Sequence, residues 1–177
     1  ADLAQPAAVG VQVLDQFPLA TLREYIDWTP FFHTWELKGV YPRILDDEKY
    51  GPQARQVFAD ANALLDRIVN EQLLTARAVY GLFPANAVGD DVEVYTDESR
   101  SDVRTRFRFL RQQMDRGDET VCRSLGDFIA PKSTGLADYI GAFAVTAGLG
   151  SGEKIAEFKA ALDDYSAILL ESLADRL

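Results

Sequence analysis

Three stretches with strand-like patterns follow one another in the middle of the chain, and no helical stretch separates them. Residues 79–83 form a short apolar run, valines alternate with other residues over 92–95, and arginines alternate with threonine and phenylalanine over 104–109. Turn residues over 84–90 join the first two stretches, which predicts a β-hairpin with a long turn. Strands that follow one another without helical crossovers pair antiparallel, so we expect an antiparallel sheet.

Helical patterns lie on both sides of these strands. Residues 52–73 carry apolar residues at helical spacing with no interruption, residues 18–27 suit one or two helical turns, and a last apolar stripe runs from 155 to 169. Two further strands are expected, a short one over 9–13 and a central one over the apolar run 138–146. The predicted fold class is therefore α+β, a twisted antiparallel sheet with flanking helices.

The chain is expected to form a single domain over residues 1–177. Its 177 residues are 47% apolar, which suffices for one hydrophobic core, and the chain is too short for two domains. The last helical pattern continues to Leu177 without a cap, a breaker or a polar tail. We therefore expect the domain to be truncated at its C-terminal end.

Charge and composition exclude several classes of function. The net charge of −10 repels phosphate backbones and anionic lipid, so nucleic acid and membranes are poor partners. The single cysteine, Cys122, cannot form an internal disulfide, which is typical of a reducing compartment, and we expect a cytoplasmic protein. A histidine-based metal site or a Ser-His-Asp triad would depend on His33 alone, so neither is expected.

Seven longer motifs occur in order from about residue 20 to the end of the chain. They cover residues 25–35 (YIDWTPFFHTW), 39–45 (GVYPRIL), 81–86 (GLFPAN), 89–95 (GDDVEVY), 110–113 (LRQQ), 127–132 (DFIAPK) and 138–146 (DYIGAFAVT). Together they resemble the N-terminal part of the activation domain of cobalamin-dependent methionine synthase. Family domains are longer, and their C-terminal part includes a proline-rich arginine loop that supplies much of the S-adenosylmethionine site.

The resemblance implies one ligand contact in this chain. Asp27 matches the family's aspartate that contacts the amino-acid end of S-adenosylmethionine, and a carboxylate can accept charge-assisted hydrogen bonds from an α-ammonium group. From local sequence alone, Asp27 is instead a helix N-cap. Thr29 is another candidate cap, for a short helix with Pro30 at its first position and Gly39 at its end.

The resemblance also implies how such a domain contributes to catalysis. S-adenosylmethionine and an electron from a flavodoxin-type donor return oxidised cobalamin to methylcobalamin in methionine biosynthesis, and the activation domain positions the methyl donor. Cobalamin would be bound by a neighbouring domain of the parent methyltransferase, and zinc only by its substrate domains. The implied partners are the cobalamin domain and flavodoxin. No catalytic residue is expected in this chain.

The aromatic residues of the first motif have two interpretations. Trp28, Phe31, Phe32 and Trp35 could stack on adenine, but aromatics three and four residues apart more often pack in a core or an interface. We therefore predict packing. His33 points away from this stripe and is expected to be an ordinary, partly exposed residue.

Two other groups are expected to be structural. Asp90, Asp91 and Glu93 could form a carboxylate pair or a magnesium site, but a polar turn and the solvated face of a strand explain them better. Cys122 lies beside Arg123, which could lower the pKa of its thiol. We expect an inert cysteine.

Six arginines stand between Arg100 and Arg116 against only Asp102 and Asp115, in an otherwise acidic chain. A solvated strand face that pairs with neighbouring acids is the ordinary explanation. Our hypothesis is that this strip docks an acidic partner, flavodoxin or the cobalamin domain, because a local positive patch steers association. Its central residues are Arg104, Arg106 and Arg108. The alternative to a ligand-presenting domain is thus an interaction-only fragment that docks such a partner without binding S-adenosylmethionine.

Overall fold

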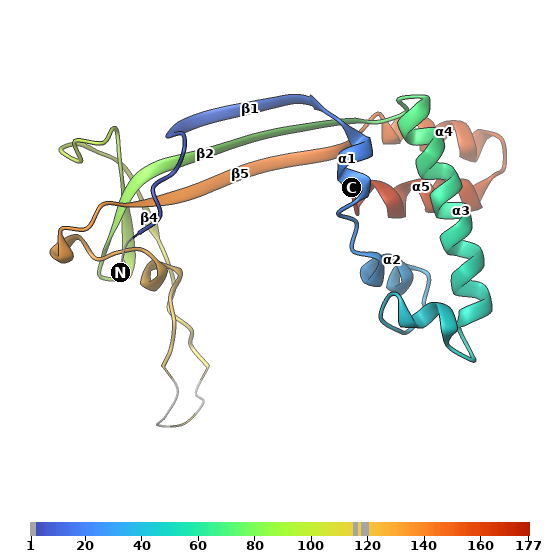
Figure 1. Ribbon diagram of the computed structural model, residues 1–177, viewed down its shortest axis with the longest axis horizontal. Helices are drawn as coiled ribbons and strands as arrows, with labels where there is room; N and C mark the ends of the chain where they lie inside the picture. The colour runs from blue at the N-terminus through green and yellow to red at the C-terminus, as the bar shows by residue number, and fades with distance from the viewer. Residues whose placement is uncertain (1–2, 115–116, 118–120) are drawn as a thin grey trace. The chain divides into compact units, whose positions relative to one another are not determined.

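The computed structural model describes residues 3–114, 117 and 121–177 (Figure 1). Within these residues five strands form one open sheet, and helices lie between the strands and after the last one, so the predicted fold class is confirmed. In chain order the elements are β1 (Gly10–Phe17), α1 (Leu19–Arg23), α2 (Trp28–Thr34), η1 (Arg43–Asp46), α3 (Gly51–Asn70), β2 (Thr75–Val88), β3 (Asp91–Tyr95), β4 (Val103–Arg108), η2 (Leu125–Phe128), η3 (Lys132–Thr134), β5 (Asp138–Leu149), α4 (Ser151–Ala160) and α5 (Asp164–Ala174).

The sheet is built around β2, which pairs with β1, β3 and β5, while β3 pairs in turn with β4. The pairs β2–β3 and β3–β4 are antiparallel. Val88 faces Asp91, so the hairpin turn holds only two residues, and Gly89 takes the positive φ of +64° that such a turn favours. The predicted long turn over 84–90 is therefore wrong, because residues 84–88 continue β2.

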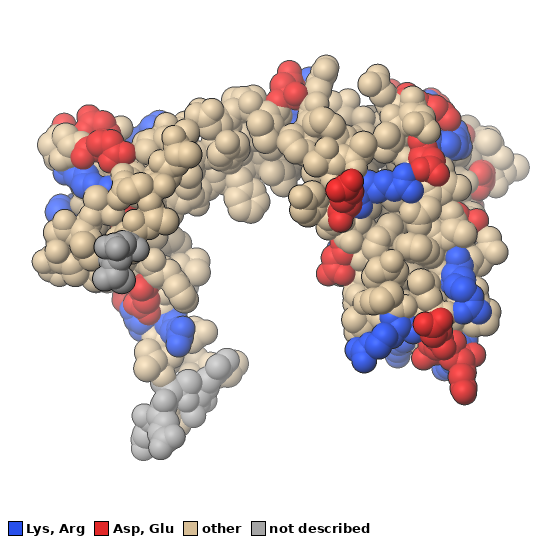
Figure 2. All heavy atoms as spheres, in the orientation of Figure 1, with Lys and Arg blue, Asp and Glu red and all other residues tan. Residues whose placement is uncertain are grey.

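Two strands differ from prediction in their burial. The alternation over 104–109 predicts a half-buried strand with arginines on one face and phenylalanines on the other, but all six residues of β4 are exposed. Strand β5 pairs with β2 alone among the described strands, and Phe143 and Val145 are 78% and 66% exposed, so it is not a buried central strand. Branched and aromatic residues are enriched in edge and central strands alike, so an apolar run indicates a strand without proving that it is buried. Figure 2 shows mostly uncharged side chains over the long strands that Figure 1 labels β2 and β5.

Residue contacts divide the chain into two compact units. The helical unit comprises residues 14–78 and 145–177, and the sheet unit comprises residues up to 13 together with 79–144. The hydrophobic core lies in the helical unit, where α3 buries one face, as its apolar spacing predicted. The residues that α3 buries are Gly51, Ala54, Val57, Ala61, Leu64, Leu65 and Ile68.

The predicted last helix is two helices, α4 and α5. Leu162 between them has a φ of +60°, which ends α4, and the Asp163 side chain accepts a hydrogen bond from the Ser166 backbone N–H at 3.0 Å. Asp163 is thus the N-cap of α5. The apolar stripe continues across this break, which is why spacing alone predicted one helix. None of the helices in the described ranges is long and apolar enough to cross a membrane.

Candidate functional site

Asp27 stands at the start of α2. Its Oδ1 accepts a hydrogen bond from the Thr29 backbone N–H at 3.1 Å, so the local expectation of an N-cap at Asp27 is confirmed. Thr29 is not the cap; its hydroxyl accepts from the Tyr41 backbone N–H at 3.1 Å instead. The helix ends at Thr34 rather than at Gly39.

The Asp27 carboxylate is held in place without being buried. The flanking side chains of Ile26 and Trp28 are 8% and 9% exposed and anchor the backbone on both sides, whereas Asp27 itself is exposed. Its Oδ2 has no hydrogen-bond or ion-pair partner among the residues that the structure describes. One carboxylate oxygen therefore organises the helix and the other remains available to a ligand. The ligand contact expected of Asp27 stays a prediction.

The aromatic residues of α2 pack behind this carboxylate, as predicted. Phe31 and Phe32 are completely buried, and Trp28 meets Phe58 edge-on with 4.7 Å between ring centroids. Phe32 stacks on Tyr41 at 6.3 Å. Such rings fill the core and hold the start of α2 in one position, so they do not form an adenine cage.

Trp35 and His33 lie toward the end of α2. Trp35 is only partly buried and lies 5.3 Å from the Tyr165 ring. His33 is exposed, as expected.

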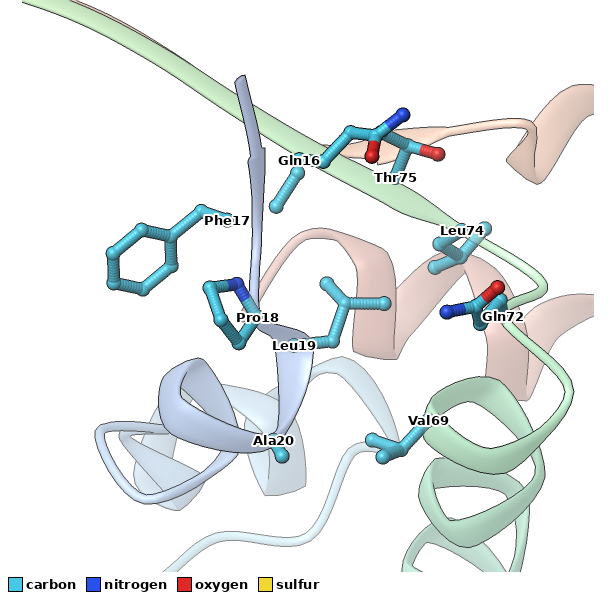
Figure 3. Close-up of a pocket in the computed structure, with 10 residues that line it drawn as sticks. Gln16, Phe17, Pro18, Leu19, Ala20, Val69, Gln72, Leu74 and Thr75 are labelled. Carbon is cyan, nitrogen blue, oxygen red and sulfur yellow. The ribbon is translucent and has the colours of Figure 1, made fainter. Parts of the chain in front are cut away.

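A cavity of about 370 Å³ lies elsewhere in the helical unit, where β1 leads into α1 and α3 leads into β2 (Figure 3). Its polar side chains are Gln16, Gln72 and Thr75, and none of its lining residues is charged. Gln72 has a φ of +51° because it terminates α3, with the Leu73 backbone N–H donating back to the Ile68 carbonyl at 3.1 Å. An uncharged cavity offers no ionic partner to a charged amino acid, so it is no substitute for the Asp27 position.

The central arginines of the predicted strip differ in their contacts. Arg106 pairs with Glu93 at 2.7 Å and Arg108 pairs with Asp91 at 3.4 Å, as expected of a strand face paired with acids. The Arg104 guanidinium instead lies 5.8 Å from the centroid of the Phe83 ring. Arginines and phenylalanines therefore do not separate cleanly onto two faces of β4. Of the longer arginine run, Asp115 and Arg116 lie outside the described residues.

Glu93 is buried, which corrects its prediction as part of a solvated strand face. Its side chain is 6% exposed and accepts hydrogen bonds from Lys132 Nζ at 2.8 Å and from Arg106 at 2.7 Å. The hydrogen bond from Lys132 is the largest influence on this carboxyl, and with Arg106 it holds the pKa of Glu93 below its usual value against the opposing effect of burial. Both cations are about half exposed, so Glu93 is a buried charge that two surface cations neutralise.

Residues from several of the sequence motifs come together at Asn86 and Glu93, which the order of the motifs along the chain did not predict. The buried Asn86 donates to the carbonyls of Ala130 and Leu136 at 3.0 and 2.9 Å. Arg100 donates to the Asn86 side chain at 3.0 Å and to the Asp138 carbonyl at 2.9 Å. Asn86 faces Glu93 across the β2–β3 hairpin, but Lys132 lies 39 residues from Glu93, so only the presence of the three residues in separate motifs could have indicated this cluster.

The turn acid Asp90 has a separate structural role. Arg111 pairs with Asp90 at 2.6 Å and with Asp127 at 2.7 Å. The hydrogen bond from Arg111 lowers the pKa of Asp127 to about 2. Within the described ranges, no three His, Cys, Asp or Glu side chains gather where they could hold a metal ion. Cys122 is exposed.

The sequence was compared with models of known protein families, and the structure with solved structures. A family model described as "Vitamin B12 dependent methionine synthase, activation domain" matches residues 18–177. A crystal structure of the MetH reactivation domain bound to AdoHcy is 50% identical in sequence, with a TM-score of 0.89. The match covers 96% of this chain and 52% of that one, so this chain spans about half the length of the solved domain. The chain belongs to the activation domain family of vitamin B12-dependent methionine synthase.

Proposed function

We propose that this chain is the part of a methionine synthase reactivation domain that holds the amino-acid end of S-adenosylmethionine. The proposal is supported by the family match and by the AdoHcy bound to the similar solved domain. The observation that carries it is the exposed Asp27 carboxylate, which has one oxygen fixed at the start of α2 and the other without a partner in the described part of the chain.

The cap geometry suits an ammonium ligand. Because Oδ1 is bound to the Thr29 N–H, the plane of the Asp27 carboxylate is fixed before any ligand arrives. Oδ2 is then free to accept a charge-assisted hydrogen bond from an α-ammonium group. The buried aromatic side chains behind α2 keep this acceptor rigid, which lowers the entropy lost on binding.

The role of this chain in the reaction would be orientation. S-adenosylmethionine supplies a methyl group for a cobalamin held by a neighbouring domain, with an electron from a flavodoxin-type donor. Positioning one reactant against another can account for several kcal/mol of a barrier without a protein acid, base or nucleophile. On this proposal the chain acts within a cytoplasmic methyltransferase of methionine biosynthesis.

An interaction-only module is the second candidate. It would use Arg104, Arg106 and Arg108 to dock the acidic flavodoxin or the cobalamin domain. Replacing all three by glutamate should slow association, with a steep dependence on salt, because the positive patch that steers the partner is reversed. Stopped-flow measurement of the association rate at several salt concentrations tests this role, and an unchanged rate would remove it.

Titration calorimetry with S-adenosylmethionine separates the two candidates. The ligand-presenting chain gives a saturable isotherm, whereas an interaction-only chain gives none. Asp27→Asn is the informative variant, because asparagine also caps helices and so keeps the start of α2 while removing the charge. Loss of a charge-assisted hydrogen bond, worth about 1.5–3 kcal/mol, should weaken binding about 10-fold to 150-fold.

A matched control comes from the other aspartate cap. Asp163→Asn makes the same chemical change at the start of α5, where the side chain accepts from Ser166 at 3.0 Å. This variant should bind S-adenosylmethionine like the parent chain. Equal affinity of the Asp27→Asn variant and the parent chain would refute the proposed contact.

A further inference from the structure

A small pocket lies on one face of the sheet unit. It encloses about 200 Å³, and its apolar walls come from β2, β3, β4 and β5. Val94 at its base is 3% exposed, whereas Phe107 is 41% exposed. The side chains that form its walls include Phe83, Val94, Phe107, Ile140 and Ala142, with Arg104 as the only charged member.

A β-bulge turns Arg104 toward this pocket. Val94 pairs with Thr105 and the next residue, Tyr95, pairs with Val103, so β4 carries one extra residue at Arg104. In a regular strand Arg104 would share the face of Arg106. The extra residue breaks this alternation, and Arg104 lies over the Phe83 ring on the pocket side.

Arg104 also differs from Arg106 and Arg108 because no carboxylate in the described part of the chain neutralises its charge. Glu93 neutralises Arg106 and Asp91 pairs with Arg108, but no carboxylate lies within ion-pair distance of Arg104 in the part of the chain that the structure describes. Its one described interaction is with the face of an aromatic ring. The pocket therefore combines an apolar base with an uncompensated cation at its edge.

We propose that this pocket receives one apolar side chain of a protein partner, and that a carboxylate next to that side chain pairs with Arg104. A volume of about 200 Å³ suits a single side chain and lies below the roughly 300–1,000 Å³ typical of metabolite sites. Arginine is also among the residues enriched in interface hot spots, which cluster in well-packed pockets. The inference goes beyond ligand binding at Asp27 and does not depend on it.

Capped dipeptides test the chemistry of the pocket directly. N-acetyl-Asp-Phe-amide is titrated into the whole chain while NMR follows the signals of Phe83, Phe107 and Ile140, with N-acetyl-Asn-Phe-amide as the uncharged comparison. We expect saturable shifts with the acidic peptide and at least 5-fold weaker binding of the Asn peptide, because only the acidic one pairs with Arg104.

Variants of two arginines on the same strand complete the test. Arg104→Gln should weaken binding of the acidic peptide at least 5-fold. Arg108→Gln removes an equal charge, but from a position already paired with Asp91, and should change the affinity for the acidic peptide less than 2-fold. Equal effects of the two variants would show that only net charge matters and would overturn the proposal. So would equal binding of both peptides, or no shifts at the three pocket residues. Calorimetry with S-adenosylmethionine reads the Asp27 site separately, so the two proposals can fail independently.

Discussion

The helical unit and the sheet unit are stabilised by different interactions. The helical unit contains all of the main hydrophobic cluster, including the completely buried Phe31, Phe32 and Leu65. The sheet unit buries apolar side chains such as Val92, and it also buries the carboxylate of Glu93 and the amide of Asn86, each of which is satisfied by partners from distant parts of the chain.

This difference indicates which kind of substitution should most affect the stability of each unit. Apolar packing has no direction and tolerates many sequences, whereas a buried polar network is favourable only when every member has its partner. We therefore expect the helical unit to respond mainly to changes of volume, and the sheet unit mainly to changes of charge.

The largest effect should follow from truncating a buried ring in the helical unit. Phe32→Ala removes a ring that is 0% exposed and leaves a cavity, so it should lower the free energy of unfolding by about 3–5 kcal/mol. Phe143→Ala, at a ring that is 78% exposed, should change it by no more than about 0.5 kcal/mol. Denaturant titration measures both, and similar losses would mean that Phe143 is covered in solution.

The next largest effect concerns the buried charge of the sheet unit. Glu93→Gln leaves Lys132 and Arg106 without their carboxylate and should lower the free energy of unfolding by about 1–3 kcal/mol. Asp91→Asn, at a side chain that is 32% exposed and bound to Arg108 at 3.4 Å, is the matched control and should cost less.

Lowering the pH should reduce the difference in free energy of unfolding between the parent chain and the Glu93→Gln variant. The pKa of Glu93 is lower in the folded chain than its ordinary value of 4.5, so its contribution is complete above that value and is lost as the pH falls through the folded pKa. Denaturant titrations repeated at successively lower pH measure this. A difference that stays constant down to the lowest pH would show that charge is not what stabilises this unit.

Sequence reasoning succeeded where the determining interactions are local. The amphipathic helix α3, the strand β4 and the cap at Asp27 all follow from residues a few positions apart. It failed at Leu162, where a single residue with positive φ divides one apolar stripe into two helices, because no glycine marks the break.

Among the candidate sites, too, the features set by nearby residues could be predicted and those set by distant residues could not. The position of Asp27 at a helix start was predictable, but the role of Glu93 depends on Lys132, 39 residues away, and no local pattern reports such a distance. The bulge at Arg104 is equally invisible, because it arises from the register between β3 and β4 rather than from a turn residue.

A smaller effect on stability should come from the cap at Asp27. Asp27→Ala leaves the Thr29 N–H without its acceptor and should lower the free energy of unfolding by about 1 kcal/mol, whereas Asp27→Asn should stay close to the parent chain. Thermal or denaturant unfolding measures both variants. If Asn is as destabilising as Ala, the charge rather than the cap stabilises α2, and the calorimetric test of Asp27 would have to allow for it.

The smallest effect concerns a tyrosine at the edge of the helical unit. Burial, together with the hydrogen bond that its hydroxyl donates to Asp60 at 2.7 Å, raises the pKa of Tyr165 to about 12 from 10.0. The folded chain therefore keeps this proton between pH 10 and 12 while the unfolded chain releases it, so stability falls with rising pH across that range. Tyr165→Phe should remove this part of the alkaline loss of stability, and an ultraviolet titration should lose the tyrosine that ionises near pH 12. A Tyr165 that titrates near 10 would show that its hydroxyl does not keep the hydrogen bond to Asp60 in solution.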